Sequence, residues 1–263
     1  MVLNIDDFGL YYEMHGSGVP LLCLPPFPFD GRIWREQRAL AECARLVIPD
    51  LRGTGRSSVT EGPYTMDLLA DDMIALLDHL EIDRAVVMGV SMGDYVAFSM
   101  YAKAPERFRG FIIADTRADA DSPETAERRK KTVEGLINQG TSILRDRVSD
   151  LFAATTRRER PALVEEMQAM AMGMNPHGLA RLTQGMALRP DRNSLLPCIQ
   201  VPTLVLCGEE DTVSPCEGMR KMAAQIPGAR FHTIAQAGHL APLEHPAAFN
   251  ALVCEFLKSL PES

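Results

Sequence analysis

Residues 85–101 constrain the fold more than any other part of the sequence. The apolar run from Ala85 to Met88 has the composition of a buried strand, and residues 95–101 have the spacing of a helix that packs on it. Between them lies Gly89-Val90-Ser91-Met92-Gly93, a G-x-S-x-G turn with a strand before it and a helix after it. Glycine is needed in so tight a turn because side chains there would collide with the strand and the helix. The pattern predicts that the Ser91 hydroxyl is exposed at the positive end of the following helix.

Short apolar runs with strand composition recur along the chain and alternate with amphipathic stretches. The clearest helix pattern covers residues 66–80, with Thr65 as the expected N-cap. Strands that alternate with helices of this length need crossover connections, so we predict an α/β fold with a mostly parallel sheet flanked by helices. The eight candidate strands cover residues 2–5, 10–14, 21–24, 45–49, 85–89, 110–114, 203–207 and 230–234.

The strand signal disappears between residue 123 and about residue 188, where we expect three or four helices. We therefore predict a core formed by residues 1–116 and 191–263, and a helical cap insertion formed by residues 117–190. The run Arg128-Arg129-Lys130-Lys131 is expected to be a solvated helix face rather than a binding patch. Several methionines of the insertion are expected to pack it onto the core, namely Met167, Met170, Met172, Met174 and Met186.

Charge and cysteine content exclude several classes of function. The net charge of −8 disfavours nucleic acids and anionic membranes as partners, and no apolar run reaches the roughly 18 residues of a membrane helix. No Lys or Arg precedes Arg32, so we expect no secretory signal and a cytoplasmic location. The cysteines form no C-x-x-C pair, no residues have metal-ligand spacing, and Gly53-Thr54-Gly55 lacks the third glycine of a dinucleotide fingerprint. We therefore predict reduced thiols, no metal, no cofactor and a small-molecule substrate, with a homo-oligomer left open.

A serine nucleophile needs a base that is itself oriented by a third group. Parallel sheets bind ligands beyond the carboxyl ends of their strands, so the partners of Ser91 should follow other strands. Among the histidines, His239 alone lies in a short glycine-containing loop just after the last predicted strand. An acid is needed to hold the imidazole tautomer and stabilise the imidazolium. The candidate acids also follow strands: Glu209, Glu210 and Asp211 are equally acceptable first choices, and Asp115 is the second choice.

The order Ser91, Asp211, His239 resembles the catalytic triad of the α/β-hydrolase superfamily. The resemblance extends over nearly the whole chain, because residues 50–57 resemble the family's loop after its fourth strand and residues 237–244 its histidine loop. In that family the acid closes a Gly-x-x-Asp turn, which favours Asp211 over the two glutamates before it. The resemblance implies an eight-stranded sheet with a helical cap, and it is strongest to the small carboxylesterase and 3-oxoadipate enol-lactonase group.

The same resemblance implies an oxyanion hole, in which two backbone N–H groups bind the negatively charged oxygen of the reaction intermediate. One N–H comes from the residue after the nucleophile, here Met92. The other comes from the loop after the third strand, which usually begins His-Gly in the family but here reads Leu24-Pro25-Pro26-Phe27-Pro28. Because proline has no N–H, Phe27 is the one candidate donor in residues 25–28.

These residues predict a serine hydrolase that cleaves carboxylic esters or lactones through an acyl-enzyme. A serine nucleophile argues against epoxide hydrolases and haloalkane dehalogenases of similar fold, which use aspartate. Cofactor-free perhydrolases, C–C hydrolases and acyltransferases use the same triad and stay open as alternatives. A non-catalytic ligand-binding member of the fold is the alternative from another class.

Asp94 departs from the family pattern, which commonly has a second small residue after Ser91-Met92-Gly93. A carboxylate in the first turn of the following helix is expected to stabilise that helix by roughly 0.3–1 kcal/mol. The same negative charge is expected to repel the developing oxyanion. Asp94→Gly should then raise kcat/KM by roughly 2- to 20-fold and lower the free energy of unfolding by about 1 kcal/mol.

Overall fold

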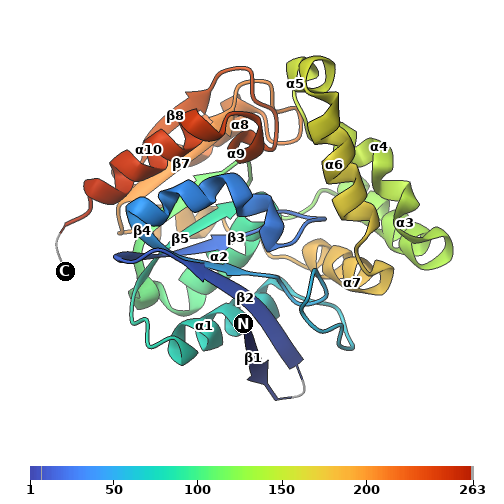
Figure 1. Ribbon diagram of the computed structural model, residues 1–263, viewed down its shortest axis with the longest axis horizontal. Coiled ribbons are helices and arrows are strands. Elements are labelled where there is room, and N and C mark those ends of the chain that lie inside the picture. The colour runs from blue at the N-terminus through green and yellow to red at the C-terminus, as the bar shows by residue number, and fades with distance from the viewer. Residues whose placement is uncertain (7, 262–263) are drawn as a thin grey trace.

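The computed structural model describes residues 1–6 and 8–261, and these form an eight-stranded, mostly parallel sheet with helices on both faces (Figure 1). The predicted fold class is therefore confirmed. The order across the sheet is β1-β2-β4-β3-β5-β6-β7-β8, in which β1–β2 and β2–β4 are antiparallel and the other pairs are parallel. The strands are β1 (Val2–Ile5), β2 (Phe8–His15), β3 (Val19–Leu24), β4 (Ala44–Pro49), β5 (Ala85–Val90), β6 (Phe108–Ala114), β7 (Thr203–Gly208) and β8 (Arg230–Ile234).

Helices connect the strands, as the alternating pattern predicts. Thr65 caps α1 as expected, since its hydroxyl accepts a hydrogen bond from the Leu68 N–H at 3.1 Å. The α-helices of the described residues are α1 (Met66–His79), α2 (Met92–Lys103), α3 (Pro123–Gln139), α4 (Arg145–Ser149), α5 (Ala154–Glu159), α6 (Pro161–Met172), α7 (Pro176–Ala187), α8 (Cys216–Ala223), α9 (Ala241–Glu244) and α10 (Pro246–Lys258). The 3-10 helices are η1 (Gly31–Glu42), η2 (Pro105–Arg107), η3 (Gly140–Leu144) and η4 (Asn193–Cys198).

The helical segment 123–187 contains five α-helices, α3 to α7, rather than the expected three or four. Gly140 ends α3 with a φ of 75°, which a continued right-handed helix does not allow. Pro161 is the first residue of α6, where its missing N–H breaks no hydrogen bond inside the helix. The two short helices α4 and α5 lie between these points, and their five and six residues are too few for a clear periodic pattern.

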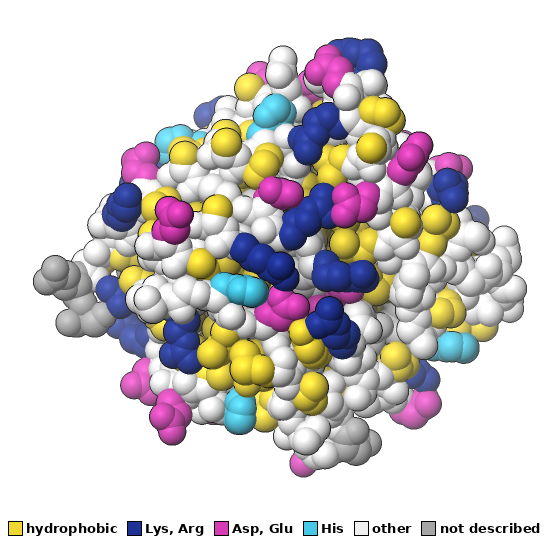
Figure 2. Space-filling view, in the orientation of Figure 1, with side chains coloured by type: hydrophobic (Ala, Val, Ile, Leu, Met, Phe, Trp, Pro, Cys, Tyr) yellow, Lys and Arg dark blue, Asp and Glu magenta, His cyan; other side chains and the backbone are white. Residues whose placement is uncertain are grey.

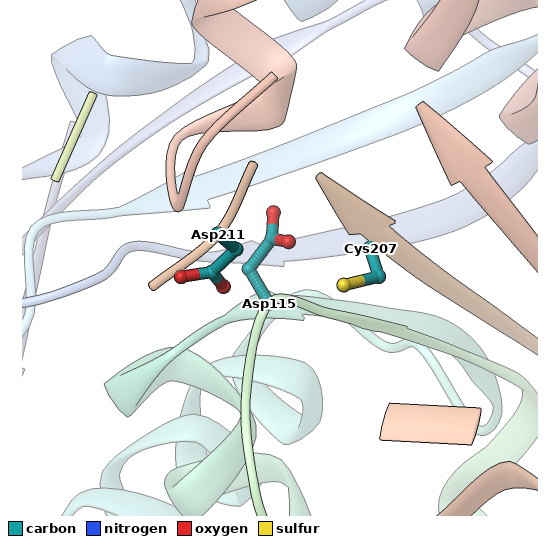
Figure 3. A group of neighbouring side chains, drawn as sticks. All are labelled: Asp115, Cys207 and Asp211. Carbon is teal, nitrogen blue, oxygen red and sulfur yellow. The ribbon is translucent and has the colours of Figure 1, made fainter. Parts of the chain in front are cut away.

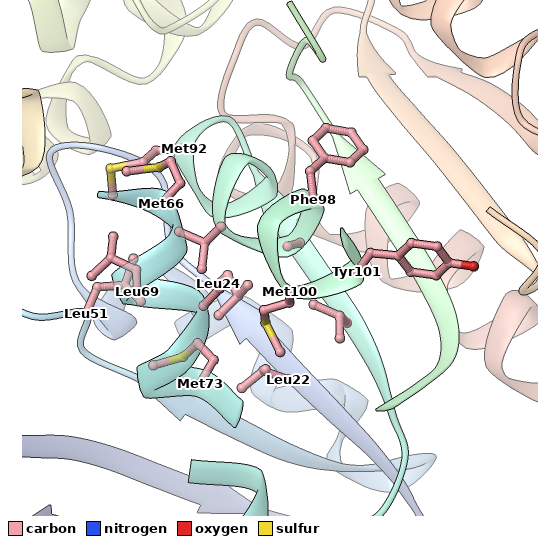
Figure 4. Close-up of a cluster of buried hydrophobic side chains, with 14 of the residues drawn as sticks. Leu22, Leu24, Leu51, Met66, Leu69, Met73, Met92, Phe98, Met100 and Tyr101 are labelled. Carbon is pink, nitrogen blue, oxygen red and sulfur yellow. The ribbon is translucent and has the colours of Figure 1, made fainter. Parts of the chain in front are cut away.

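Hydrophobic cores lie on both faces of the sheet. On one face, α1 and α2 lie side by side against β3 (Figure 4). On the other face, η1 and α10 cover the sheet through buried side chains that include Trp34 and Phe249. The strand β5 is buried along its whole length, so the start of α2 has a rigid support. The side chains labelled in Figure 4 are Leu22, Leu24, Leu51, Met66, Leu69, Met73, Met92, Phe98, Met100 and Tyr101.

The helical segment 123–187 gathers at the right of the view in Figure 1, and α7 contacts the rest of the protein through its backbone. A Cβ atom built on Gly185 would lie 1.6 Å from the Tyr64 carbonyl oxygen. One built on Gly178 would lie 2.1 Å from the Gly53 carbonyl oxygen. The Tyr64 N–H also donates a hydrogen bond to the Arg181 carbonyl oxygen at 3.1 Å. These contacts fix α7 against residues 53–64.

Gly185→Ala is expected to lower the free energy of unfolding by at least about 2 kcal/mol, since the new methyl group overlaps a backbone carbonyl that cannot rotate away. Alanine favours a helix over glycine by about 1 kcal/mol, so the steric cost must exceed that gain. Gly218→Ala in α8 is the matched control, because nothing lies within 4 Å of the added Cβ and the change should stabilise the protein. Urea unfolding of the three proteins measures both effects. Equal stability of the two variants would contradict the close docking of α7.

Exposed charges also connect the helical segment to the core, as between Arg35 of η1 and Glu166 of α6. On the face shown in Figure 2, basic and acidic side chains are interspersed, with small hydrophobic areas between them. Exposed ion pairs contribute only about 0–1 kcal/mol each, so the docking of the segment depends mainly on close and apolar contacts. No helix within the described ranges is long and apolar enough to cross a membrane.

Candidate active site

Ser91 lies on the tight turn between β5 and α2, with φ 54° and ψ −113°. Residues other than glycine rarely adopt a positive φ, and such conformations cluster at functional sites. A Cβ atom on Gly93 would lie 2.2 Å from the Leu24 carbonyl oxygen, and one on Gly89 would lie 2.4 Å from Asp94 Oδ1. Both glycines are therefore required for the turn that carries Ser91, as the G-x-S-x-G pattern predicts.

His239 and Asp211 form a buried hydrogen-bonded pair, with 2.8 Å between His239 Nδ1 and Asp211 Oδ2. His239 lies in the loop between β8 and α9, and Asp211 in the turn after β7. The other oxygen of Asp211, Oδ1, accepts hydrogen bonds from the N–H groups of Val213 and Ser214 at 2.7 and 3.0 Å. Burial acts to raise the pKa of Asp211, but His239 and these N–H groups outweigh it and hold that pKa below its usual value. The carboxylate is therefore ionised and orients the imidazole through Nδ1.

The two glutamates next to Asp211 make other contacts. Glu209 accepts a hydrogen bond from the Gln236 N–H at 3.3 Å, and Glu210 accepts one from the Thr155 hydroxyl at 3.3 Å. Of the acids that the residues alone left open, the structure brings Asp211 to His239, in agreement with the Gly-x-x-Asp resemblance.

Asp115 lies beside Asp211 and Cys207 (Figure 3). Each of the three has a side-chain atom that could bind a metal ion, and these atoms lie within 4.8 Å of one another. The spacing of the residues in the sequence did not reveal this group. Asp115 Oδ1 already accepts a hydrogen bond from the Gly208 N–H at 2.7 Å, and both oxygens of Asp211 have partners. Burial, followed by the charge of Asp211, raises the pKa of Asp115 well above its usual value. A carboxyl group that favours its protonated form suits a metal ion poorly, because metal ligands must be deprotonated.

Glu244 is a buried carboxylate that the sequence analysis did not single out. Its Oε1 accepts a hydrogen bond from the Gly238 N–H at 2.8 Å, and its Oε2 accepts one from the Ala153 N–H at 2.9 Å. The His239 N–H in turn donates to the Leu151 carbonyl oxygen at 2.8 Å. The loop that carries His239 is therefore bonded directly to residues 151–153 of the helical segment. The signal that could have found Glu244 is a single acid directly after the apolar residues 240–243.

A pocket of about 320 Å³ lies beside Ser91 and His239. Phe27 lines it from the loop after β3, and Met186 lines it from α7. The helical segment also supplies three basic side chains to its lining, namely Arg128, Arg129 and Arg147. The first two belong to the run that the sequence predicted to be a solvated helix face. Of the methionines expected to pack the insertion, Met167, Met174 and Met186 are buried.

The backbone N–H groups of Phe27 and Met92 are the predicted oxyanion donors. Among residues 1–6 and 8–261, neither N–H donates a hydrogen bond to another part of the chain. Met92 is the first residue of α2, where an N–H has no partner inside the helix. Phe27 lies in the loop after β3 and lines the same pocket as Ser91. Both groups are thus available to bind an oxygen atom of a substrate.

The structure does not support the expected role of Asp94 as a charged carboxylate that repels the oxyanion. Asp94 is completely buried, and its Oδ2 accepts a hydrogen bond from the Ala114 N–H at 3.0 Å. Burial outweighs that hydrogen bond and raises the pKa of Asp94 well above its usual value, which favours the protonated form. A neutral carboxyl group does not repel an oxyanion, so the gain in kcat/KM expected for Asp94→Gly has no basis. That change would instead leave a cavity and an unbonded N–H on Ala114.

Asp94→Asn tests the protonation of this buried group. The raised pKa means that the folded protein keeps a proton that the unfolded chain loses above about pH 4. The contribution of Asp94 to stability is therefore complete below about pH 4 and declines as the pH rises toward the folded-state pKa. Relative to Asp94→Asn, the wild type should lose about 1.4 kcal/mol of stability per pH unit in this window. Urea unfolding at pH 5 and pH 6 measures the change, and a constant difference between the two proteins would mean that Asp94 is ionised.

Comparisons with known proteins agree with this geometry. The model of a family described as alpha/beta hydrolase fold matches residues 19–246. The chain is 31% identical to 3-oxoadipate enol-lactonase 2 from Acinetobacter baylyi, over 97% of this chain and 96% of that protein. It is 30% identical to a putative carbamate hydrolase from Azorhizobium caulinodans, over 95% of both chains. A thermophilic esterase from Thermogutta terrifontis, solved with malate bound, has a TM-score of 0.94 and 39% identity over 96% of this chain and 94% of that one. The protein belongs to the α/β-hydrolase family.

Proposed function

We propose that the protein hydrolyses carboxylic esters or lactones through an acyl-enzyme on Ser91. Ser91 Oγ attacks the carbonyl carbon while His239 Nε2 accepts the hydroxyl proton, and His239 then gives that proton to the leaving alcohol. A water molecule next transfers a proton to His239 and attacks the acyl carbon. The bond to Ser91 Oγ then breaks, and His239 gives its proton to Ser91 Oγ as the acid leaves. Asp211 holds the imidazole tautomer and stabilises the imidazolium. The N–H groups of Phe27 and Met92 bind the oxyanion in both steps.

The observation that carries this proposal is that His239 pairs with Asp211 and lines the same pocket as Ser91. An ionised Asp211 draws the imidazole proton to Nδ1, which leaves Nε2 unprotonated and able to act as a base. The tautomer is assigned from this hydrogen bond. The relatives support the substrate class, because one is named an enol-lactonase and another an esterase. The relative named a putative carbamate hydrolase makes carbamates the second class to test.

We also infer that residues 117–190 act as a cap that forms one wall of the pocket and excludes water. Support comes from Arg147 and Met186, which line the pocket from α4 and α7. The backbone contacts of α7 and the hydrogen bonds of residues 151–153 hold the cap at two places.

A fluorophosphonate probe tests the proposed function, because it labels only an activated serine. Labelling should occur on the peptide that contains Ser91, should be absent in Ser91→Ala, and should be unchanged in Ser142→Ala, which alters an exposed serine of the cap. Turnover should then be measured with p-nitrophenyl acetate, a five-membered lactone and a phenyl carbamate. Folded protein that is neither labelled nor active on any of these would be a ligand-binding member of the family rather than a hydrolase.

A further inference from the structure

We propose that the pocket beside Ser91 takes a substrate that carries a carboxylate, and that Arg128 and Arg147 bind this carboxylate. The inference rests on the proposed function, since it names the substrate class of the same site. It assigns a binding role to two arginines, one of which the sequence pattern had placed on a solvated helix face.

The charged lining of the pocket is unbalanced. It includes three arginines, and Asp150 is the one carboxylate in its described lining. Asp150 is already paired with Arg157, which lies 3.3 Å from it and outside the pocket lining. The pocket therefore has an excess of positive charge on the cap side, whereas the surface in Figure 2 mixes the two signs.

The three arginines differ in their partners. Arg129 pairs with Asp121, so its charge is compensated in part by a carboxylate that also binds Arg189. Arg128 and Arg147 form no ion pair with any carboxylate in the part of the chain that the structure describes. Two guanidinium groups that line the same pocket as Ser91 are thus left for an anion that comes from outside the protein.

Arg147 is held in place by a buried threonine. Its Nη1 donates a hydrogen bond to Thr132 Oγ1, and the Thr132 hydroxyl donates to the Arg128 carbonyl oxygen at 2.8 Å. Thr132 is only 3% exposed, so the link between α3 and α4 is fixed. Burial, followed by the charges of Arg128 and Arg129, lowers the pKa of Arg147, as expected where guanidinium groups lie close together without an anion. A bound carboxylate would relieve this repulsion.

The chemistry of the guanidinium group suits a carboxylate. Its planar fork of N–H donors matches the two oxygens of a carboxylate, and such charge-assisted hydrogen bonds are about twice as strong as neutral ones. Ser91 belongs to the core, while Arg128 and Arg147 lie on α3 and α4 of the cap. The reacting carbonyl is therefore expected toward the core and the carboxylate toward the cap. A substrate needs a spacer between its two groups that spans the pocket.

Matched ester pairs test this inference. One pair is p-nitrophenyl adipate, whose other end is a free carboxylate, and its methyl ester. The second pair has the charge on the leaving group: 4-carboxyphenyl acetate and the methyl ester of the same compound. In at least one pair the wild type should have a higher kcat/KM for the charged ester than for its methyl ester. Arg128→Gln and Arg147→Gln should each raise KM for that ester by about 5- to 30-fold. The neutral ester should change by less than about 2-fold, and Arg147→Lys should partly restore KM because it keeps the charge.

Arg158→Gln is the matched control, since Arg158 is an exposed cap arginine outside the pocket lining. It should leave both esters unaffected. The rate of Ser91 labelling by a neutral fluorophosphonate should be the same in all variants, which separates a binding role from damage to the fold. A wild type with no preference in either pair, or arginine variants that slow both members equally, would overturn the carboxylate assignment while the hydrolase remains. Loss of labelling and turnover in the wild type would instead refute the proposed function itself.

Discussion

Ser91→Ala and His239→Ala are each expected to lower kcat for ester hydrolysis by about 10⁴- to 10⁶-fold, with little further loss in the double variant. Without Ser91 Oγ no acyl-enzyme forms, and without His239 no group nearby accepts the hydroxyl proton. Because the two residues act in one step, removing the second costs little once the first is gone. The activity left should come from the N–H groups of Phe27 and Met92 and from substrate binding. Initial rates with p-nitrophenyl acetate should be measured for the three variants and compared with the rate of the wild type.

His232→Ala is the control for the histidine change, because His232 is exposed on β8 and lies outside the pocket lining. It should keep wild-type activity, and urea unfolding should show that every variant is folded. Losses that multiply in the double variant would mean that Ser91 and His239 act independently. A Ser91→Ala protein with more than a tenth of wild-type activity would point to another nucleophile.

Asp211→Asn is expected to lower kcat on the order of 10⁴-fold, whereas Asp115→Asn should lower it by less than about 10-fold. An amide at position 211 would offer an N–H to His239 Nδ1 and favour the tautomer with the proton on Nε2, which cannot accept the Ser91 proton. Burial and the charge of Asp211 favour the protonated form of Asp115, so asparagine resembles that form and can still accept the Gly208 N–H. Both changes convert an aspartate to an asparagine, and the two residues lie next to each other, so each variant is a control for the other.

The comparison needs kcat at pH 7 and the free energy of unfolding for both asparagine variants. Folded Asp115→Asn with the larger loss of kcat would mean that Asp115, and not Asp211, supports His239. Similar small losses in both variants would mean that the carboxylate makes little contribution to the reaction.

The fold and the Ser91 turn could be predicted because their signals are local. The strand, the turn and the helix around Ser91 are contiguous in the sequence, and the need for glycine at positions 89 and 93 follows from the turn itself. The partners of Ser91 lie far away in the chain, but Asp211 and His239 each follow a strand. The carboxyl ends of parallel strands meet at one edge of the sheet, so their approach also follows from the strand pattern.

Properties that depend on tertiary packing could not be predicted in the same way. Asp94 looks like a charged helix-start residue, and only the packing of α2 against β5 and β6 shows that it is buried and bonded to the Ala114 N–H. Arg128 and Arg147 are separated by 19 positions and meet because η3 turns the chain back between α3 and α4. Glu244 is a similar case, since the N–H of Ala153 reaches it from the cap.

The backbone contacts of α7 limit how this protein can be recombined with its relatives. If residues 117–190 were replaced by the matching segment of a relative, the contacts would be kept only if that segment also has glycine at the positions of Gly178 and Gly185. The recipient would also need the matching chain path at Gly53 and Tyr64. Chimeras with crossover points inside the cap, between α6 and α7, would keep these contacts intact. They would also exchange α3 and α4, the part of the cap that contains Arg128 and Arg147.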